Sequence, residues 1–125
     1  MIKGSVDGLQ ARLDVTFRFL DKPAVTIEFV VDTGFQGELT LPQAAVQALG
    51  LPYIQEMSSN LANDSSVKTD SHVATIVWNG YEKDVLVLAL GRRPLLGTAL
   101  LENMNLNVDF VDGGLVRIES VEAQI

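Results

Sequence analysis

The chain has 125 residues, of which 47% are hydrophobic, and a mean hydropathy of +0.23. This composition excludes a disordered chain and predicts one compact domain over residues 1–125 with a single substantial core. The chain contains no cysteine and one histidine, His72, which excludes disulfides and thiolate metal sites and disfavours a zinc site built from imidazoles. We therefore expect neither a metal nor a cofactor.

The formal net charge of −7 disfavours two polyanionic partners, nucleic acid and an anionic membrane surface. No apolar run approaches the length needed to span a bilayer, and residues 1–7 lack the apolar core of a signal peptide. The sequence thus predicts a cytoplasmic protein that binds neither nucleic acid nor membrane.

The first third of the chain predicts three strands. Leu13, Val15, Phe17 and Phe19 alternate with polar residues, as in a strand with one buried face. Residues 25–31 begin with the same alternation and end in an apolar run. Asp7-Gly8 is predicted to close the first hairpin, and residues 20–23 carry the next turn.

The middle third combines one short helix with two hairpins. Residues 39–41 are predicted to be extended, and residues 42–50 carry helix signals, with proline in the first turn and glycine at the end. Residues 55–78 are strand-like with a turn near 63–66, and Asn79-Gly80 is a strong hairpin signal. The apolar run 85–90 predicts a strand covered on both faces.

In the last third, residues 94–97 are predicted to form a loop, and a second short helix is predicted from Thr98 to about Asn103. Residues 106–110 and 115–120 are predicted to form a hairpin closed by residues 112–114. With about eight short strands and two short helices, the chain is predicted to be all-β, in the sense of mainly β, with a closed or sandwich fold.

Two segments narrow this prediction. "VVDTGFQGELTLP" at 30–42 and "PLLGTALL" at 94–101 each run an apolar strand into a glycine-containing bend. Together with "LGL" at 49–51, a hairpin near 58–72 and "NVDF" at 107–110, they resemble the ordered signature of retropepsin-like aspartyl proteases. Phe35 after the triplet resembles a prokaryotic DTGF-type branch of that clan. The resemblance implies a retropepsin-like acid-protease closed barrel with one lobe per chain.

The chemistry of that family uses two carboxylates. They share a proton and activate a water, because two like charges about 3 Å apart cannot both ionise cheaply. This chain has one Asp-Thr-Gly, and no other aspartate stands in a comparable apolar-to-glycine setting. A two-carboxylate mechanism therefore requires a homodimer that pairs Asp32 with Asp32 of a second copy. The resemblance further implies that strands near 2–6 and 116–125 help to seal the interface.

The resemblance assigns roles to individual residues. Asp32 would be catalytic, Gly34 would allow the tight turn, and the Thr33 hydroxyl would bond a matching loop. The hairpin near 58–72 would cover an extended peptide or protein substrate as a flap. The residues expected to contact substrate are Phe35, Leu61, Ala62, Asn63, Asp64, Leu95 and Leu96.

Two other interpretations stay open. The first is a non-catalytic retropepsin-like module that dimerises or binds peptide, since a fold can outlive its chemistry. Phe35, which cannot donate a hydrogen bond as a serine or threonine could, and a flap without glycine between Gly50 and Gly80 keep it open. The second is an unrelated small β-barrel binding protein in which Asp32-Thr33-Gly34 is a plain turn.

Overall fold

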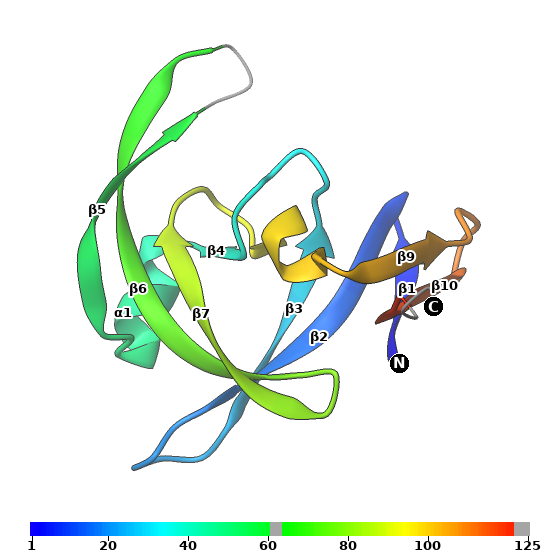
Figure 1. Cartoon of the computed structure of the whole chain (residues 1–125), viewed down its shortest axis with the longest axis horizontal. Helices are drawn as coiled ribbons and strands as arrows, with labels where there is room; N and C mark the ends of the chain where they lie inside the picture. The colour runs from blue at the N-terminus through cyan, green and yellow to red at the C-terminus, as the bar shows by residue number, and fades with distance from the viewer. Residues whose placement is uncertain (61–63, 122–125) are drawn as a thin grey trace.

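The computed structural model describes residues 1–60 and 64–121. In this part of the chain, one mixed sheet of ten strands accompanies one α-helix and one 3-10 turn, which confirms the mainly β prediction (Figure 1). The strands are β1 (Ile2–Asp7), β2 (Gln10–Arg18), β3 (Val25–Val31), β4 (Leu39–Leu41), β5 (Tyr53–Asn60), β6 (Ser66–Trp78), β7 (Tyr81–Ala89), β8 (Leu95–Leu96), β9 (Met104–Val108) and β10 (Leu115–Ser120).

The sheet closes on itself. The strand order is β5-β6-β7-β4-β8-β3-β2-β1-β10-β9, and β2 also pairs with β6, with Phe17 opposite Ile76. This extra pairing joins β2, β3, β8, β4, β7 and β6 into a ring, as the prediction of a closed barrel requires. β5 continues the sheet from one side of the ring, and β1, β10 and β9 continue it from the other (Figure 1).

The three N-terminal strands form as predicted. Alternate residues of β2 point into the core, where the rings of Phe17 and Phe29 stack with centroids 6.0 Å apart. The first hairpin turns one residue later than predicted, because Asp7 pairs with Gln10. Gly8 and Leu9 are therefore its two central residues, at φ 56° and 62°, which is the left-handed conformation that two-residue hairpin turns favour.

Helix α1 (Gln43–Leu49) lies where it was predicted. Pro42 precedes it, and Gly50 ends it in a left-handed conformation at φ 66°, where glycine has no Cβ to clash. Lys22, from the β2–β3 connection, donates to the carbonyl of Leu49, the last helical residue. The helix packs its buried residues Val46 and Leu49 against the barrel core.

The second predicted helix is shorter than expected. It is a single 3-10 turn, η1 (Thr98–Leu101), and ends before Asn103. Thr98 is its first residue rather than its cap, and the Thr98 hydroxyl donates to the carbonyl of Phe35 at 3.3 Å. Bonds from Thr98 and Ala99 to the loop at residues 35–37 hold the start of η1, and the turn ends at Glu102, whose backbone leaves the helical conformation at ψ 133°.

The hairpin at Asn79-Gly80 is confirmed, with both residues at positive φ and Trp78 opposite Tyr81. The prediction that residues 85–90 are covered on both faces is wrong at Leu86, which is 36% exposed. Leu86 pairs with the half-buried Val73 on the other face of the strand from the buried Val85 and Val87. A continuous apolar run therefore does not guarantee burial of every residue.

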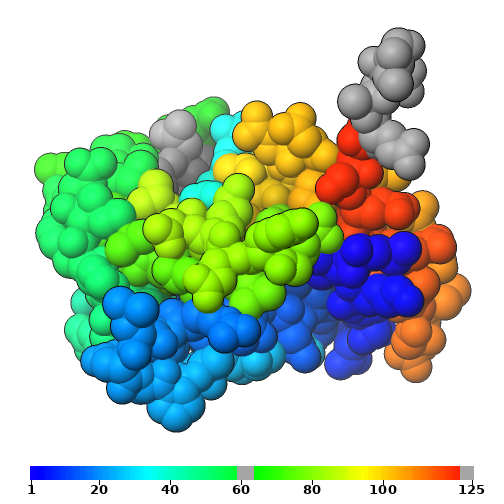
Figure 2. All heavy atoms as spheres, turned by 60° about the horizontal axis from the view of Figure 1, so that its bottom comes forward, coloured from blue at the N-terminus to red at the C-terminus, as the bar shows by residue number. Residues whose placement is uncertain are grey.

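The N-terminal strand lies against the C-terminal hairpin at one end of the molecule (Figure 2). β1 pairs with β2 on one edge and with β10 on the other, and β10 lies between β1 and β9. β1 pairs with β2 only over residues 5–7, and β10 pairs with β1 only over residues 115–118. Residues 122–125 lie outside the described part, and a role of the terminal strands in an interface stays a prediction. In the described chain, no helix is both long and apolar enough to cross a membrane.

Candidate active site

Asp32 follows the last residue of β3 and is half-buried. Its backbone N–H donates to the carbonyl of Leu96 at 2.9 Å, and the N–H of Val30 donates to the carbonyl of Pro94 at 3.0 Å. Between these bonds, β3 and β8 pair in parallel, with Val31 opposite Leu96. The segment at residues 94–96 therefore fixes the backbone that carries the carboxylate, and the two signature segments of the sequence meet.

The carboxylate is also held within its own loop. Asp32 Oδ1 accepts a hydrogen bond from the N–H of Gly34 at 2.9 Å, and the N–H of Phe35 donates to the Asp32 carbonyl at 3.1 Å. A Cβ on Gly34 would lie 3.2 Å from Oδ1, which is tight, so a glycine leaves room for the carboxylate. Thr33 and Gly34 are exposed, and a bond from the Thr33 hydroxyl to a matching loop stays a prediction.

Phe35 packs between the two signature segments. Its carbonyl accepts hydrogen bonds from the N–H of Thr98 at 2.8 Å and from the Thr98 hydroxyl. A Cβ on Gly37 would collide with the Phe35 ring, and a Cβ on Gly97 would collide with the ring and with the Gly37 carbonyl. The half-buried ring therefore needs glycine on both sides, and Phe35 helps to join the Asp32 loop to η1.

Two polar residues that the sequence analysis did not select complete this junction. Thr40 is 2% exposed, and its hydroxyl accepts from the N–H of Leu95 at 3.2 Å and donates to the Arg93 carbonyl at 3.3 Å. A Glu38 carboxylate oxygen accepts from the N–H of Leu86 in β7, and the Glu38 carbonyl accepts from the N–H of Gly97, both at 2.9 Å. In the sequence, Thr40 stands between two leucines of a short apolar strand, and this position could have indicated that its hydroxyl is buried and hydrogen-bonded.

Asp32 and Thr33 line a hollow of about 610 Å³. It lies between the end of β3, the β1–β2 turn, and the strand β9 with the residues that follow it. Most of the other residues that line it are apolar, and the rest are Gln10 and Arg93. The apolar ones are Leu9, Ala11, Val30, Val31, Leu95, Leu106, Val108 and Phe110. Nothing in the sequence indicated that the two hairpin ends lie beside Asp32.

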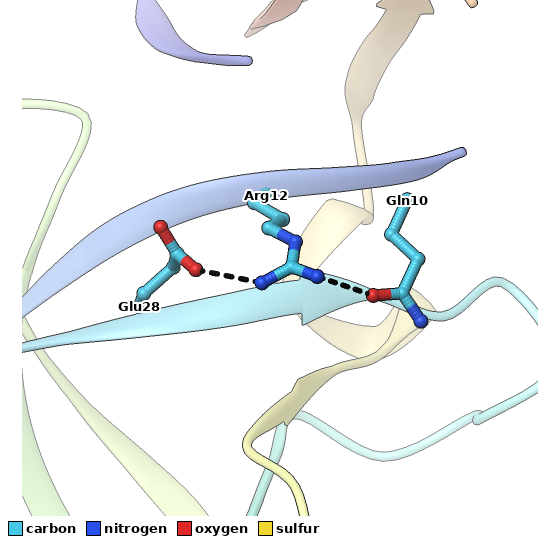
Figure 3. A network of polar contacts seen from close by, with 3 residues as sticks. All are labelled: Gln10, Arg12 and Glu28. Atoms are coloured by element: carbon cyan, nitrogen blue, oxygen red, sulfur yellow. Dashed lines mark hydrogen bonds and ion pairs between the residues drawn. The ribbon is translucent and has the colours of Figure 1, made fainter. Parts of the chain in front are cut away.

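Arg12 supports the strand that leads to Asp32. Its guanidinium donates to Glu28 at 3.1 Å and to Gln10 at 2.8 Å (Figure 3). Arg12 lies directly opposite Val30 in the β2–β3 pairing, so this network joins the two strands just before the Asp32 loop. Because the side chains of Arg12 and Glu28 are 30% and 56% exposed, we expect the ion pair to contribute less than about 1 kcal/mol.

Of the predicted substrate contacts, Phe35 packs on Gly37 and Gly97, and its contact with substrate stays a prediction. The other six fall into three groups. Leu95 lines the hollow, whereas Leu96 is fully buried in the core. Asp64 is exposed at φ 64°, a conformation that aspartate tolerates. The other flap residues, Leu61, Ala62 and Asn63, lie outside the described residues.

The hairpin of β5 and β6 projects from the barrel on the same side as the Asp32 loop (Figure 1). Its described residues do not line the hollow, and their contact with substrate stays a prediction. In the described ranges, no three carboxylate or imidazole groups gather into a set that could hold a metal ion.

The fold is shared with a solved structure. The crystal structure of a retropepsin-like aspartic protease from Rickettsia conorii superimposes with a TM-score of 0.64 at 22% sequence identity, over 92% of this chain and 88% of the other. No family model matches the sequence. The curated proteins contain no match either. This chain therefore has the retropepsin-like fold, with an Asp-Thr-Gly loop joined to a Leu-Leu-Gly segment.

Proposed function

We propose that the protein is an aspartic endopeptidase that acts as a homodimer, with one Asp32 carboxyl from each subunit. The observation that carries the proposal is the placement of Asp32 at the end of a core strand, half-buried and lining a largely apolar hollow. In the described part of the chain, Asp32 takes part in no ion pair. A carboxylate positioned in this way suits acid–base chemistry better than a structural role.

In the proposed reaction, a water lies between the two carboxyls, which share one proton. The ionised carboxyl takes a proton from the water while the water oxygen attacks the peptide carbonyl carbon, and the protonated carboxyl donates to the carbonyl oxygen. Collapse of the tetrahedral intermediate breaks the C–N bond, and a proton passes to the leaving amine. The products are a carboxylic acid and an amine, so atoms and charge balance without a cofactor.

The substrate in this proposal is a peptide in extended conformation. The hairpin of β5 and β6 extends beyond the barrel on the same side as the Asp32 loop (Figure 1), and β5 is an end strand of the sheet. Extended peptides bind proteins through main-chain hydrogen bonds to exposed backbone groups. We therefore propose that residues 61–64 contact the peptide over the catalytic loops.

Hydrolysis of a peptide library from acidic to neutral pH tests the proposal. Asp32→Asn keeps the size of the side chain and removes the acid, and we expect cleavage to fall by about a thousandfold or more. Asp14→Asn is the matched control, because Asp14 is exposed on β2 and should leave cleavage unchanged. Cleavage that survives in Asp32→Asn would contradict the assignment.

One observation favours a non-catalytic peptide-binding or dimerisation module as the second candidate. The residue after the triplet is Phe35, whose ring packs on Gly37 and Gly97 and offers Asp32 no hydroxyl. This candidate predicts that the wild-type protein binds extended peptides and leaves them intact at every pH in the same library.

A further inference from the structure

Exposed apolar side chains gather beside Asp32. Leu9 is 79% exposed and Phe110 is 61% exposed, and both line the hollow that Asp32 also lines. Val111, the next residue, is 63% exposed. Single exposed apolar residues are ordinary, but a group of them around a hollow marks an interaction surface.

The backbone at Leu9 gives independent support. Leu9 has φ 62°, a left-handed conformation that glycine and asparagine adopt readily and that leucine adopts at a cost. Its side chain is exposed at the same time, so the isolated chain gains little burial from it. A residue with a conformational cost and little burial indicates a role outside the isolated subunit.

Strand pairing limits how a second copy could bind. β1 pairs with β10 over residues 2–5 and with β2 over residues 5–7, and β10 lies between β1 and β9, so β1 and β10 offer a second copy little free edge. The outer edge of β9, whose residues 106 and 108 line the hollow, is unpaired in the described chain, so a second copy can be held here both through that edge and through side chains. The side chains available next to Asp32 are those of the β1–β2 turn and of the segment after β9.

The charge of this surface fits a second copy of the same chain. The chain carries a formal charge of −7, so two copies repel one another over most of their surfaces. The residues that line the hollow include one acid, Asp32, and one base, Arg93, so their formal charges sum to zero. Three acids stand close in sequence to the exposed apolar residues: Asp7 precedes Leu9 by two residues, and Asp109 and Asp112 flank Phe110 and Val111. They would lie at the rim of a contact.

We propose that the second copy docks on this hollow, and that Leu9 and Phe110 supply the main apolar contacts of the interface. The inference rests on the proposed homodimeric function and locates its subunit contact. A two-fold contact uses the same patch on both copies. Because Asp32 and Thr33 belong to the patch, a copy docked there brings its own Asp32 to the site that lacks a second carboxylate.

Sedimentation of two variants tests the inference. We expect Leu9→Asn and Phe110→Ser each to weaken self-association by about tenfold or more, since each removes a large apolar contact. Leu20→Asn is the matched control, because Leu20 is 108% exposed in the β2–β3 connection and its replacement should leave association unchanged.

Leu9→Asn is also expected to raise the thermal midpoint of the dilute, monomeric chain, because asparagine suits the left-handed turn. Loss of the dimer in this variant would therefore not come from unfolding.

The outcomes separate this inference from the proposed function. If both variants associate like the wild type, the interface lies elsewhere, and Asp32-dependent cleavage can still hold. If they associate normally but raise the KM for peptides, the hollow binds substrate, and the inference is overturned. If they lose the dimer while the wild type shows no Asp32-dependent cleavage, the interface is supported and the proposed function fails. A wild-type chain that is monomeric at high concentration overturns both.

Discussion

Phe35 and the glycines around it show how single residues set the geometry near Asp32. The Phe35 ring occupies the space where a Cβ on Gly37 or Gly97 would stand. The Phe35 carbonyl also receives the first N–H of η1. An aromatic residue after the triplet therefore requires small residues in both loops, and the three positions depend on one another.

Gly97→Ala should destabilise the protein by about 1–3 kcal/mol, the usual cost of overpacking a well-packed region. The added methyl would meet the backbone carbonyl of Gly37 as well as the ring, and a backbone atom cannot rotate away. Urea denaturation measures the loss in the free energy of unfolding.

Gly80→Ala is the comparison for that variant. Gly80 has open space around it but φ 85°, so alanine there should cost about 1 kcal/mol for its conformation alone. If Gly97→Ala costs no more than Gly80→Ala, the two loops are not packed as tightly as described.

At the scale of secondary structure, helix α1 depends on a neighbouring connection as well as on its own sequence. The helix has seven residues, too few to be stable alone. Lys22 reaches its last turn from the β2–β3 connection, and the Lys22 ammonium lies 4.4 Å from the centroid of the Phe19 ring. A cation at this end also complements the helix dipole.

Lys22→Met should lower the free energy of unfolding by about 1 kcal/mol, because it removes the charged donor and keeps most of the aliphatic chain. Thermal unfolding followed by circular dichroism measures the change. Lys83→Met, in an exposed part of β7, serves as the control and should be close to neutral. Equal midpoints for the two variants would mean that Lys22 does not support the helix.

Local sequence predicted the elements whose bounds are set locally. Pro42 and Gly50 located the helix, and Asn79-Gly80 located a hairpin, because proline and glycine restrict their own backbones. The end of η1 was missed because no proline or glycine marks it. The role of Thr40 was missed because its partners Arg93 and Leu95 are 53 and 55 residues away.

The sequence predicted one part of the candidate site and missed another. The triplet identified Asp32, and the order of the motifs indicated that Leu95 and Leu96 would join it. The apolar walls contributed by Leu9 and Phe110 could not be foreseen, because the pairing of β1 with β10 brings those hairpin ends together. Leu96 was expected to contact substrate, yet it is buried next to a residue that lines the hollow, since neighbouring residues of a strand face opposite sides.

For the whole molecule, net charge opposes the proposed assembly. Two chains of formal charge −7 repel one another, and dissolved salt screens that repulsion. We expect the dissociation constant of the dimer to fall severalfold between about 0.05 M and about 0.5 M sodium chloride, since the Debye length shortens from above 10 Å to a few Å. Sedimentation equilibrium at both salt concentrations measures the change. Weaker association at high salt would instead indicate an interface held by ion pairs.

The pairing of β3 with β8 also has a consequence for the order of folding. Thr98 and Phe35 are 63 residues apart in sequence, and every backbone bond that the Asp32 loop makes to residues 94–99 spans a comparable stretch. Closing such long loops is slow, and contacts of this kind form late. A growing chain would therefore carry its Asp-Thr-Gly without the partner segment that positions it until residues 94–99 have been synthesised. The Asp32 loop should be among the last parts of the molecule to become ordered.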